Sequence, residues 1–400
     1  MRTRIRVVGV GLATVVALSG CSAGATGTGS AGSGSAVPSG RVLAPSSSAP
    51  AAAVSLTISP AADTTKVRPD DGVSVTARDG RLTSVSVVAA DGTKVTGEIA
   101  DGGTSWSNTA HLAPSATYKV TAVAVNADGV STTKRTSFST LRPPALASAS
   151  IQPGDGWVVG VGMPVVITFS SRVRNRADVE KSLEVRTTPS VAGDWRWTGS
   201  RQVQWRPKTF WATGTKVKVV ADLKGVEVAD GVWGKRTRTS DFEIGSAMVS
   251  TVDIKHHTMT VRRNGKVLKV IPVTTGKPGL ATRNGTKVII SRETEHRMDA
   301  ATTGVDQDSP EYYNLLVKYA MRLTWSGEFV HAAPWSVGSQ GRANVSHGCT
   351  GMSTSNARWL FNESKVGDVV VYKNGSRTLE DGNGYTGWNM SFDRWSSSDA

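Results

Sequence analysis

The stretch SGEFVHAAPWSVGSQGRANVSHGC, residues 326–349, ends on one of only two cysteines in a chain of 400 residues. A strand is predicted from Gly327 to His331, where aromatic and β-branched residues lead up to the histidine. After Cys349, the run Ser353-Thr354-Ser355-Asn356-Ala357 is typical of a capped helix start. The thiol is therefore expected between the end of a strand and the beginning of a helix.

These residue types suit catalysis by a thiolate nucleophile. A helix N-terminus and a nearby imidazole both stabilise a thiolate and lower the pKa of the cysteine. His331, held where a strand meets a loop, is the expected general base. Gly348 permits a tight turn, and its N–H together with that of Cys349 is expected to form an oxyanion hole. The alternative is that the cysteine is only a small buried apolar side chain.

The other cysteine, Cys21, follows a secretory signal. Residues 1–20 carry three arginines and then an apolar run that is too short to span a bilayer as a helix. The sequence at 18–21, Leu-Ser-Gly-Cys, resembles the bacterial lipobox, which implies that Cys21 is diacylated and attaches the protein to the membrane. An ordinary signal peptide with an incidental cysteine is the alternative. Residues 21–53, rich in Ser, Gly, Ala and Pro, are predicted to form a disordered tether.

The chain is strongly basic, with a formal net charge of +14 and a pI near 9.9. Export excludes nucleic acid as the partner that such a charge would otherwise indicate. The basic residues are spread along the chain, which favours a solvated surface among anionic wall polymers. The expected location is the outer face of the cytoplasmic membrane, lipid-anchored and facing the cell wall.

Two regions have the alternating pattern of short antiparallel strands. Residues 54–142 contain such segments separated by Asp-Gly turns, and residues 143–246 continue in the same style, so each is predicted to be an Ig-like β-sandwich. Within the second region, Glu227, Asp230 and Gly231 form a weak calcium candidate. An acidic hairpin tip is the alternative for these three residues.

The third region, residues 247–375, is predicted to be the catalytic domain. It opens with a hairpin over 259–270, whose Asn264-Gly265 tip suits a type I′ turn. Further strands are predicted at 286–290 and 366–372. The region therefore supplies the β-rich frame around the thiol.

The tail, residues 376–400, carries four aromatic side chains in a polar context: Tyr385, Trp388, Phe392 and Trp395. Aromatic rings are costly to leave in water, so the tail is expected to fold back onto the catalytic domain or the second sandwich. A surface for stacking against glycans is the alternative.

Residues 326–349 resemble the signature of the YkuD-type L,D-transpeptidases, with His331 ahead of the His-Gly-Cys core at 347–349. The order of lipobox, tether, two sandwiches, catalytic domain and aromatic tail is similar to that of family members with two bacterial Ig-like domains, so the likeness covers nearly the whole chain. The implied fold class is mainly β: two Ig-like β-sandwich domains, then a β-rich catalytic domain with a short helix after the cysteine and a Trp-rich C-terminal tail.

The resemblance implies that the protein is a peptidoglycan L,D-transpeptidase. Cys349 would be acylated by the third residue of a tetrapeptide stem with release of D-Ala, and the thioester would pass to the side-chain amine of a neighbouring stem. His331 matches the general base, oriented by the carbonyl of Ala332. His347 and Gly348 match residues of the catalytic motif.

The resemblance also implies a set of substrate-binding positions. Tyr313 matches an aromatic wall of the donor pocket, and Ser326 and Gly327 match backbone contacts to the stem. Two positions depart from the pattern, since many members have Asn at Gly351 and a tyrosine at Thr303. The predicted substrate-binding residues are Tyr313, Ser326, Gly327, Ser346, Gly351 and Thr303.

No cofactor is predicted, because the chain has neither an H-E-x-x-H nor a C-x-x-C pattern. The resemblance implies peptidoglycan stem peptides as substrates, carbapenem-type β-lactams as covalent inhibitors and a monomer. The competing hypothesis is a non-catalytic wall-binding lipoprotein with a degenerate transpeptidase domain. Gly351 and Thr303 favour that hypothesis, whereas the pair of His331 and Cys349 favours the enzyme.

Overall fold

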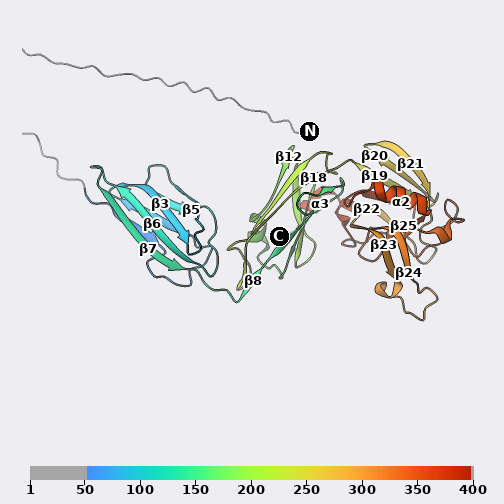
Figure 1. The fold of residues 1–400 in the computed structure, drawn as a ribbon, viewed down its shortest axis with the longest axis horizontal. Coiled ribbons are helices and arrows are strands. Elements are labelled where there is room, and N and C mark those ends of the chain that lie inside the picture. Colours follow the sequence, from blue (N-terminus) through green and yellow to red (C-terminus); the bar gives the residue numbers. More distant parts are fainter. Residues whose placement is uncertain (1–51, 398–400) are drawn as a thin grey trace, which may run out of the picture. The chain divides into compact units, whose positions relative to one another are not determined.

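A computed structural model of the chain describes residues 52–397. The predicted signal peptide, Cys21 and nearly all of the predicted tether lie outside the described residues. The described chain is built mainly from β-strands (Figure 1), which confirms the predicted fold class. No helix within residues 52–397 combines the length and the apolar character needed to cross a membrane.

The first sandwich pairs a sheet of strand order β1-β2-β5-β4 with a sheet of order β3-β6-β7. Alternate residues of β1, β2 and β6 point inward, and the stacked rings of Tyr118 and Phe138, 5.3 Å apart, lie in an apolar core. Its strands are β1 (Ser55–Ser59), β2 (Ser74–Arg78), β3 (Arg81–Ala89), β4 (Gly97–Ile99), β5 (Ser105–Asn108), β6 (Thr117–Val125) and β7 (Ser131–Ser139).

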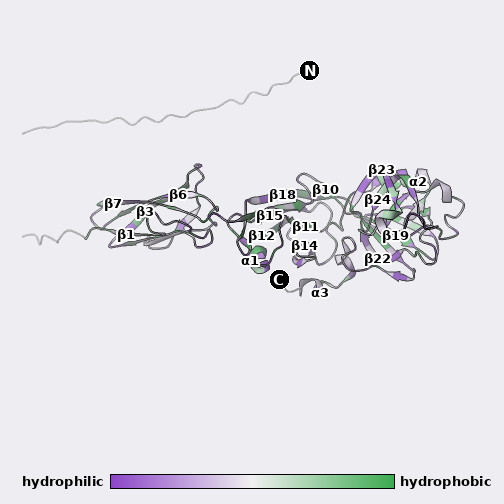
Figure 2. Cartoon of the chain, turned by 90° about the horizontal axis from the view of Figure 1, so that it is seen from below, coloured by the Kyte–Doolittle hydropathy of each residue, from purple (hydrophilic) through white to green (hydrophobic). Residues whose placement is uncertain are grey.

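The second sandwich has two four-stranded sheets, of order β10-β18-β15-β12 and β13-β14-β11-β9, and a small third sheet, β16-β17-β8. Apolar and polar residues are interleaved along the strands (Figure 2). Its elements are β8 (Ala145–Ala147), β9 (Ala149–Gln152), β10 (Val158–Val159), β11 (Val165–Phe169), α1 (Arg176–Lys181), β12 (Leu183–Thr188), β13 (Gly193–Trp197), β14 (Gln202–Pro207), β15 (Lys216–Asp222), β16 (Glu227–Ala229), β17 (Val232–Gly234) and β18 (Thr237–Ile244).

The third region contains a six-stranded sheet, β21-β20-β19-β27-β22-β28, and a four-stranded sheet, β23-β24-β25-β26. The predicted hairpin is β20–β21, and Asn264 and Gly265 at its tip both have positive φ, as a type I′ turn requires. The elements are β19 (Met248–Asp253), β20 (Thr258–Arg263), β21 (Lys266–Pro272), β22 (Arg283–Val288), β23 (Ser291–Asp299), η1 (Ala300–Thr303), β24 (Asn314–Arg322), β25 (Phe329–Ala332), η2 (Pro334–Ser336), β26 (Thr350–Met352), α2 (Thr354–Glu363), β27 (Val369–Lys373) and β28 (Arg377–Thr378).

Helix α2 fills the space beside the four-stranded sheet. Ala357 and Leu360 are its buried residues, and they join a core that includes Met321 of β24 and Val330 of β25. The hydroxyl of Ser353 accepts a hydrogen bond from the third residue of the helix and caps it. The core thereby supports β25, the strand that carries the predicted base.

The aromatic tail, with η3 (Thr386–Asn389) and α3 (Phe392–Ser396), packs against the second sandwich. The indole N–H of Trp388 donates to the Gly162 carbonyl at 2.8 Å, and that of Trp395 donates to the Asp194 carbonyl at 2.9 Å. The guanidinium of Arg206 lies 4.9 Å from both indole rings. The expectation that the tail folds back is correct, and Trp395 is buried rather than offered to a glycan.

Candidate active site

The candidate site lies where β25 and β26 run side by side. These strands pair in parallel, with His331 opposite Gly351, so Cys349, the residue just before β26, lies beside the strand that carries the histidine. Both side chains line one cavity of about 270 Å³. The residues lining this cavity are Thr274, Met298, Tyr313, Leu315, His331, Ala333, Trp335, Ser336, Val345, Ser346, His347, Cys349 and Gly351.

His331 is fixed by the backbone of its own strand. Its Nδ1 lies 2.8 Å from the carbonyl oxygen of Ala332, as the sequence predicted for the orienting contact. Because a carbonyl can only accept, Nδ1 carries the proton, and the lone pair of the neutral ring is on Nε2. The histidine is therefore prepared to accept a proton.

The thiol of Cys349 is held by two backbone groups. Sγ donates to the Gly327 carbonyl at 3.5 Å, and the backbone N–H of Phe329 acts on the thiol in the direction that lowers its pKa. The hydroxyl of Ser346 donates to the Cys349 carbonyl at 2.6 Å and accepts from the N–H of Gly348 at 3.1 Å. The prediction that the Gly348 N–H is free for an oxyanion hole is therefore wrong in this structure, while the role of the Cys349 N–H stays a prediction.

The expected helix does not begin next to the thiol. Residues 350–352 form β26, and α2 starts only at Thr354, after the capping Ser353. The sequence pattern located the helix correctly but missed the short strand, since three residues are too few to show a period. The dipole of α2 is thus separated from Cys349 by a strand.

Two predicted site residues line the cavity near its rim. The ring of Tyr313 lies 4.9 Å from that of His347. His347 Nε2 is 2.7 Å from a carboxylate oxygen of Glu311, which also pairs with Lys277 at 2.8 Å. Sequence reasoning missed Glu311 and Lys277, because single charged residues in loops look like ordinary solvated side chains.

The remaining predicted substrate residues lie in different surroundings. The N–H of Ser326 donates to Asn383, and the exposed Thr303 lies against Gly327 rather than in the cavity wall. Gly351 lines the cavity, but a Cβ at this position would lie 2.8 Å from the Cβ of Ala333. Gly351 is therefore closely packed against Ala333, and its lack of a side chain does not enlarge the cavity.

The calcium candidate is a salt-bridged hairpin. Glu227 accepts the N–H of Gly231 at 2.8 Å and pairs with Arg68 of the first sandwich at 2.9 Å. Its carboxylate is thus already engaged, which favours the hairpin alternative over a cation site that includes Asp230. Within residues 52–397, no three His, Cys, Asp or Glu side chains are grouped so that they could hold a metal ion.

Comparison with known proteins agrees with this geometry. Residues 64–227 match the model of a bacterial Ig domain, and residues 247–371 match that of the L,D-transpeptidase catalytic domain. The chain is 40% identical to L,D-transpeptidase 2 of Mycobacterium tuberculosis over 332 residues, which cover 83% of this chain and 81% of the relative. The chain belongs to the L,D-transpeptidase family. It is accordingly an enzyme that crosslinks peptidoglycan.

Two further similarities each cover a little more than half of the chain. L,D-transpeptidase 1 of the same organism is 41% identical over 222 residues, covering 56% of this chain and 83% of the relative. The solved structure of the LD transpeptidase LdtMt1 in complex with imipenem has a TM-score of 0.50 at 41% identity, and the match covers 56% of this chain and 97% of that chain.

Burial decides the charge states of Cys349 and His331 in this L,D-transpeptidase. Desolvation raises the pKa of the Cys349 thiol to about 12, while the Phe329 N–H acts in the opposite direction. Desolvation lowers the pKa of His331 to about 4, partly offset by its bond to Ala332. The expectation of a lowered thiol pKa is wrong here, and near neutral pH both groups are uncharged.

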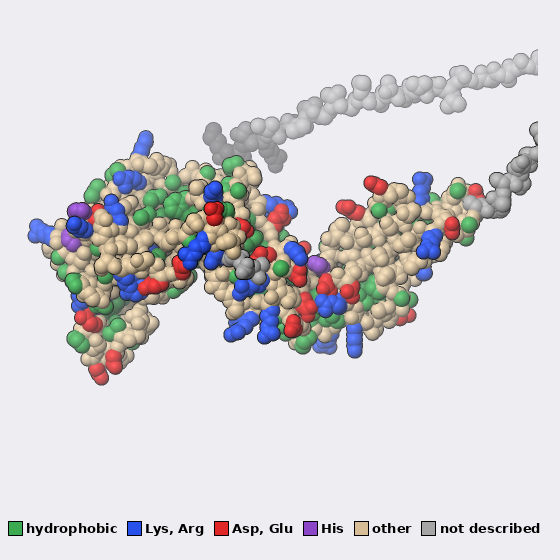
Figure 3. Space-filling model, turned by 180° about the vertical axis from the view of Figure 1, so that it is seen from behind, with side chains coloured by type: hydrophobic (Ala, Val, Ile, Leu, Met, Phe, Trp, Pro, Cys, Tyr) green, Lys and Arg blue, Asp and Glu red, His purple; other side chains and the backbone are tan. Residues whose placement is uncertain are grey.

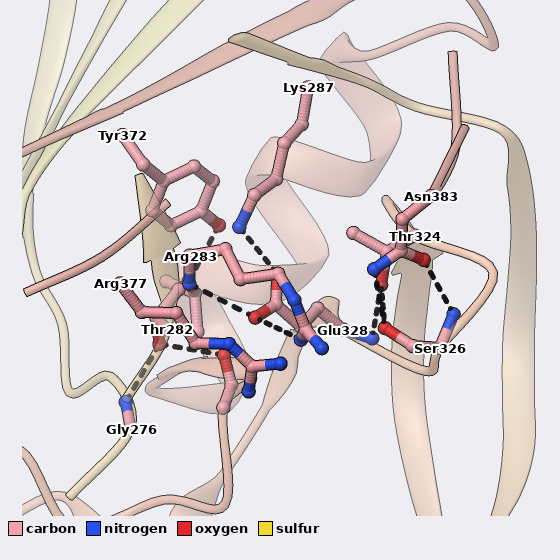
Figure 4. Close-up of polar contacts among 12 residues, drawn as sticks. Gly276, Thr282, Arg283, Lys287, Thr324, Ser326, Glu328, Tyr372, Arg377 and Asn383 are labelled. Atoms are coloured by element: carbon pink, nitrogen blue, oxygen red, sulfur yellow. Dashed lines mark hydrogen bonds and ion pairs between the residues drawn. The ribbon is translucent and has the colours of Figure 1, made fainter. Parts of the chain in front are cut away.

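Sequence reasoning also missed a buried ionic cluster behind the transpeptidase thiol. The carboxylate of Glu328 pairs with the Lys287 ammonium at 2.5 Å and with the Arg283 guanidinium at 3.0 Å (Figure 4). A signal was present in the sequence, because Glu328 falls within the strand predicted from Gly327 to His331 and directly precedes apolar residues, where a charge is unusual.

Proposed function

We propose that Cys349 is the nucleophile and His331 the base of this L,D-transpeptidase. The observation that carries the proposal is that the two side chains line one cavity, His331 from β25 and Cys349 from the residue just before the parallel strand β26, with Nδ1 of the histidine bonded to a backbone carbonyl. This is the arrangement of nucleophile, base and orienting group that activates a weak nucleophile.

The proposed reaction begins with an uncharged thiol and an uncharged imidazole. Sγ of Cys349 bonds to the carbonyl carbon of the third residue of a tetrapeptide stem, and its proton moves to Nε2 of His331. The amide bond to D-Ala breaks, and the leaving amine takes that proton. A thioester on Cys349 remains.

In the second half, the side-chain amine of a neighbouring stem attacks the thioester. His331 takes a proton from the amine, the carbon–sulfur bond breaks, and the proton returns to sulfur. The product is an amide crosslink and a regenerated thiol. The N–H of Cys349 is the proposed donor to the oxyanion in both halves.

We also propose that the enzyme is exported, attached to the membrane through acylated Cys21 and monomeric. Basic side chains are scattered over the face that Figure 3 shows and are mixed with acidic ones, which suits a solvated protein among anionic wall polymers. The sandwiches would carry the catalytic domain from the membrane into the wall.

A carbapenem is proposed as a covalent inhibitor of Cys349. Support comes from the related LdtMt1 structure, which was solved in complex with imipenem. A β-lactam carbonyl would occupy the place of the stem carbonyl, and opening of the ring would leave a thioester with no separate leaving group to depart.

The test is conversion of a purified disaccharide-tetrapeptide by the purified protein, followed by mass spectrometry of the products. The proposal expects one D-Ala released for each crosslinked dimer formed, with no reaction by Cys349→Ala. A wild-type protein that binds the muropeptide without releasing D-Ala would instead favour a non-catalytic wall-binding lipoprotein.

A further inference from the structure

The two backbone groups that hold the thiol of Cys349 flank a single residue. Gly327, whose carbonyl accepts from Sγ at 3.5 Å, precedes Glu328, and Phe329, whose backbone N–H lowers the pKa of the thiol, follows it. Any movement of residue 328 along the chain direction therefore moves both contacts to the sulfur.

Glu328 is anchored on the inner side by buried charges. Its side chain is 5% exposed and that of Lys287 is fully buried, and their carboxylate and ammonium groups meet at 2.5 Å. The other carboxylate oxygen accepts from Nη1 of Arg283 at 3.0 Å and from the backbone N–H of the same residue at 3.1 Å. Figure 4 shows both cations directed at the carboxylate.

Thr282, which directly precedes Arg283 of this cluster, contacts the residue before Cys349. Its hydroxyl donates to the carbonyl of Gly348 at 2.7 Å and accepts from the N–H of Gly276 at 2.8 Å. Gly348 has a φ of +124°, and the Oε1 atom of Glu328 lies 3.8 Å from the point where its Cβ would be. The carboxylate thus lies directly behind the turn that presents Cys349.

We propose that Glu328, anchored by Lys287 and Arg283, is a positioning residue that fixes residues 327–329 and the Gly348 carbonyl around the thiol of Cys349. Apolar side chains of similar volume would fill this space at lower desolvation cost, so the ion pair is poorly explained as a means of stabilisation. The ion pair instead fixes the orientation of the Glu328 side chain, since three donors hold its carboxylate. The inference rests on the proposed role of Cys349 as the nucleophile.

The experiment measures acylation of the purified protein by imipenem, separating the affinity of the first reversible complex from the limiting rate of the covalent step. Glu328→Gln is expected to lower the limiting rate about 10- to 100-fold, because small displacements of reacting groups are costly. The dissociation constant of the reversible complex should change less than about twofold, since Glu328 does not line the cavity. The matched control is Glu295→Gln in the exposed pair with Lys318, which should leave both values unchanged.

A second readout separates positioning from charge alone. Removing the negative charge of Glu328 favours the thiolate, so alkylation of Cys349 by iodoacetamide should be as fast as in the wild type or faster, while acylation becomes slower. A rise in both rates together would show that the carboxylate acts only through its charge, and would overturn the inference. The other titratable groups facing the thiol are unchanged in this variant: Lys287, Arg283, Arg322, His331, Tyr313 and Tyr372.

A folded Glu328→Gln protein that is acylated at the wild-type rate also overturns the inference. If that variant does not fold, the double variant Lys287→Met, Glu328→Leu carries no unpaired buried charge and is the substitute. It should fold and be acylated about 10- to 100-fold more slowly, and a wild-type rate would overturn the inference. Absence of acylation in the wild-type protein would instead overturn the proposed role of Cys349, so the two failures are distinct.

Discussion

The interiors of the first sandwich and the catalytic domain are built from different side chains. Among the described residues up to position 142, the buried polar side chains are the uncharged Asn126 and Thr140. The catalytic domain buries Lys287, Glu328 and Asp368 together with His331. Charge inside a β-fold costs desolvation energy, so it is retained where it does something that apolar packing does not.

This contrast divides the expected effects of mutation into two kinds. A core substitution in the first sandwich should reduce stability and leave the chemistry of Cys349 unchanged. A substitution of His331 or Glu328, which lie beside Cys349, should change acylation by more than it changes stability, whereas a substitution of Asp368 should act on stability alone. The predictions below test that division.

The largest expected effect belongs to His331→Ala, which removes the proposed base from the cavity. The rate of acylation at Cys349 should fall by about 10²- to 10⁴-fold while the fold is retained. The measurement is the rate of imipenem acylation followed by intact mass. A variant as fast as the wild type would show that the base is misassigned, with His347 as the next candidate.

Phe138→Ala should destabilise the first sandwich by about 3–5 kcal/mol, because the ring stacks on Tyr118 in a closed apolar core. Urea unfolding measures this loss, and Val130→Ala, at a residue 61% exposed, is the control with little change. Acylation of the folded variant should equal that of the wild type. A large loss of acylation would contradict the expectation that the core of the first sandwich affects stability but not the chemistry of Cys349.

Asp368 should make the stability of the catalytic domain depend on pH. Burial raises the pKa of its carboxyl to about 7, and its Oδ1 has no hydrogen-bond partner among residues 52–397. The folded state therefore keeps the proton in a range where the unfolded chain has lost it, and stability falls as pH rises from about 4 to about 7.

Asp368→Asn should remove this dependence. The free energy of unfolding of the variant, relative to that of the wild type, should rise by about 2–4 kcal/mol between pH 4.5 and 7.5. Urea unfolding at the two values checks the sign. A relative stability that falls over this range would show that the buried carboxyl is ionised and stabilised in the folded protein.

The smallest effect is expected for Gly351→Ala, because the added Cβ meets Ala333 at 2.8 Å and Thr274 at 3.1 Å. The cost should be about 1–3 kcal/mol of stability, with slower acylation as β26 shifts. Gly338→Ala is the matched control, since a Cβ there meets nothing within 4 Å. Equal melting temperatures for the two variants would contradict the close packing at position 351.

Much of the fold could be predicted from local patterns. Alternating strands, Asp-Gly and Asn-Gly turns and the Ser353 cap all depend on residues close together in sequence, so the sandwiches, the β20–β21 hairpin and α2 were located. The strand β26 was missed, because its pairing with β25 depends on residues about twenty positions away.

The site could be predicted where the residue type itself indicates the chemistry, as for a cysteine or a histidine. Cys349, His331 and the Ala332 carbonyl meet as expected, while the pKa direction of the thiol depends on burial that no local pattern displays. The Lys287–Glu328 pair joins β22 to the residue just before β25 through space, so the local pattern showed an unusual charge at Glu328 but not its partner.

The central claim is that Cys349 carries the acyl group, and intact-mass spectrometry of the protein after incubation with imipenem tests it most directly. The account predicts one adduct for each wild-type chain, located on the peptide containing Cys349, and none on Cys349→Ala. An unmodified wild-type protein, or an adduct that persists on Cys349→Ala, would contradict it.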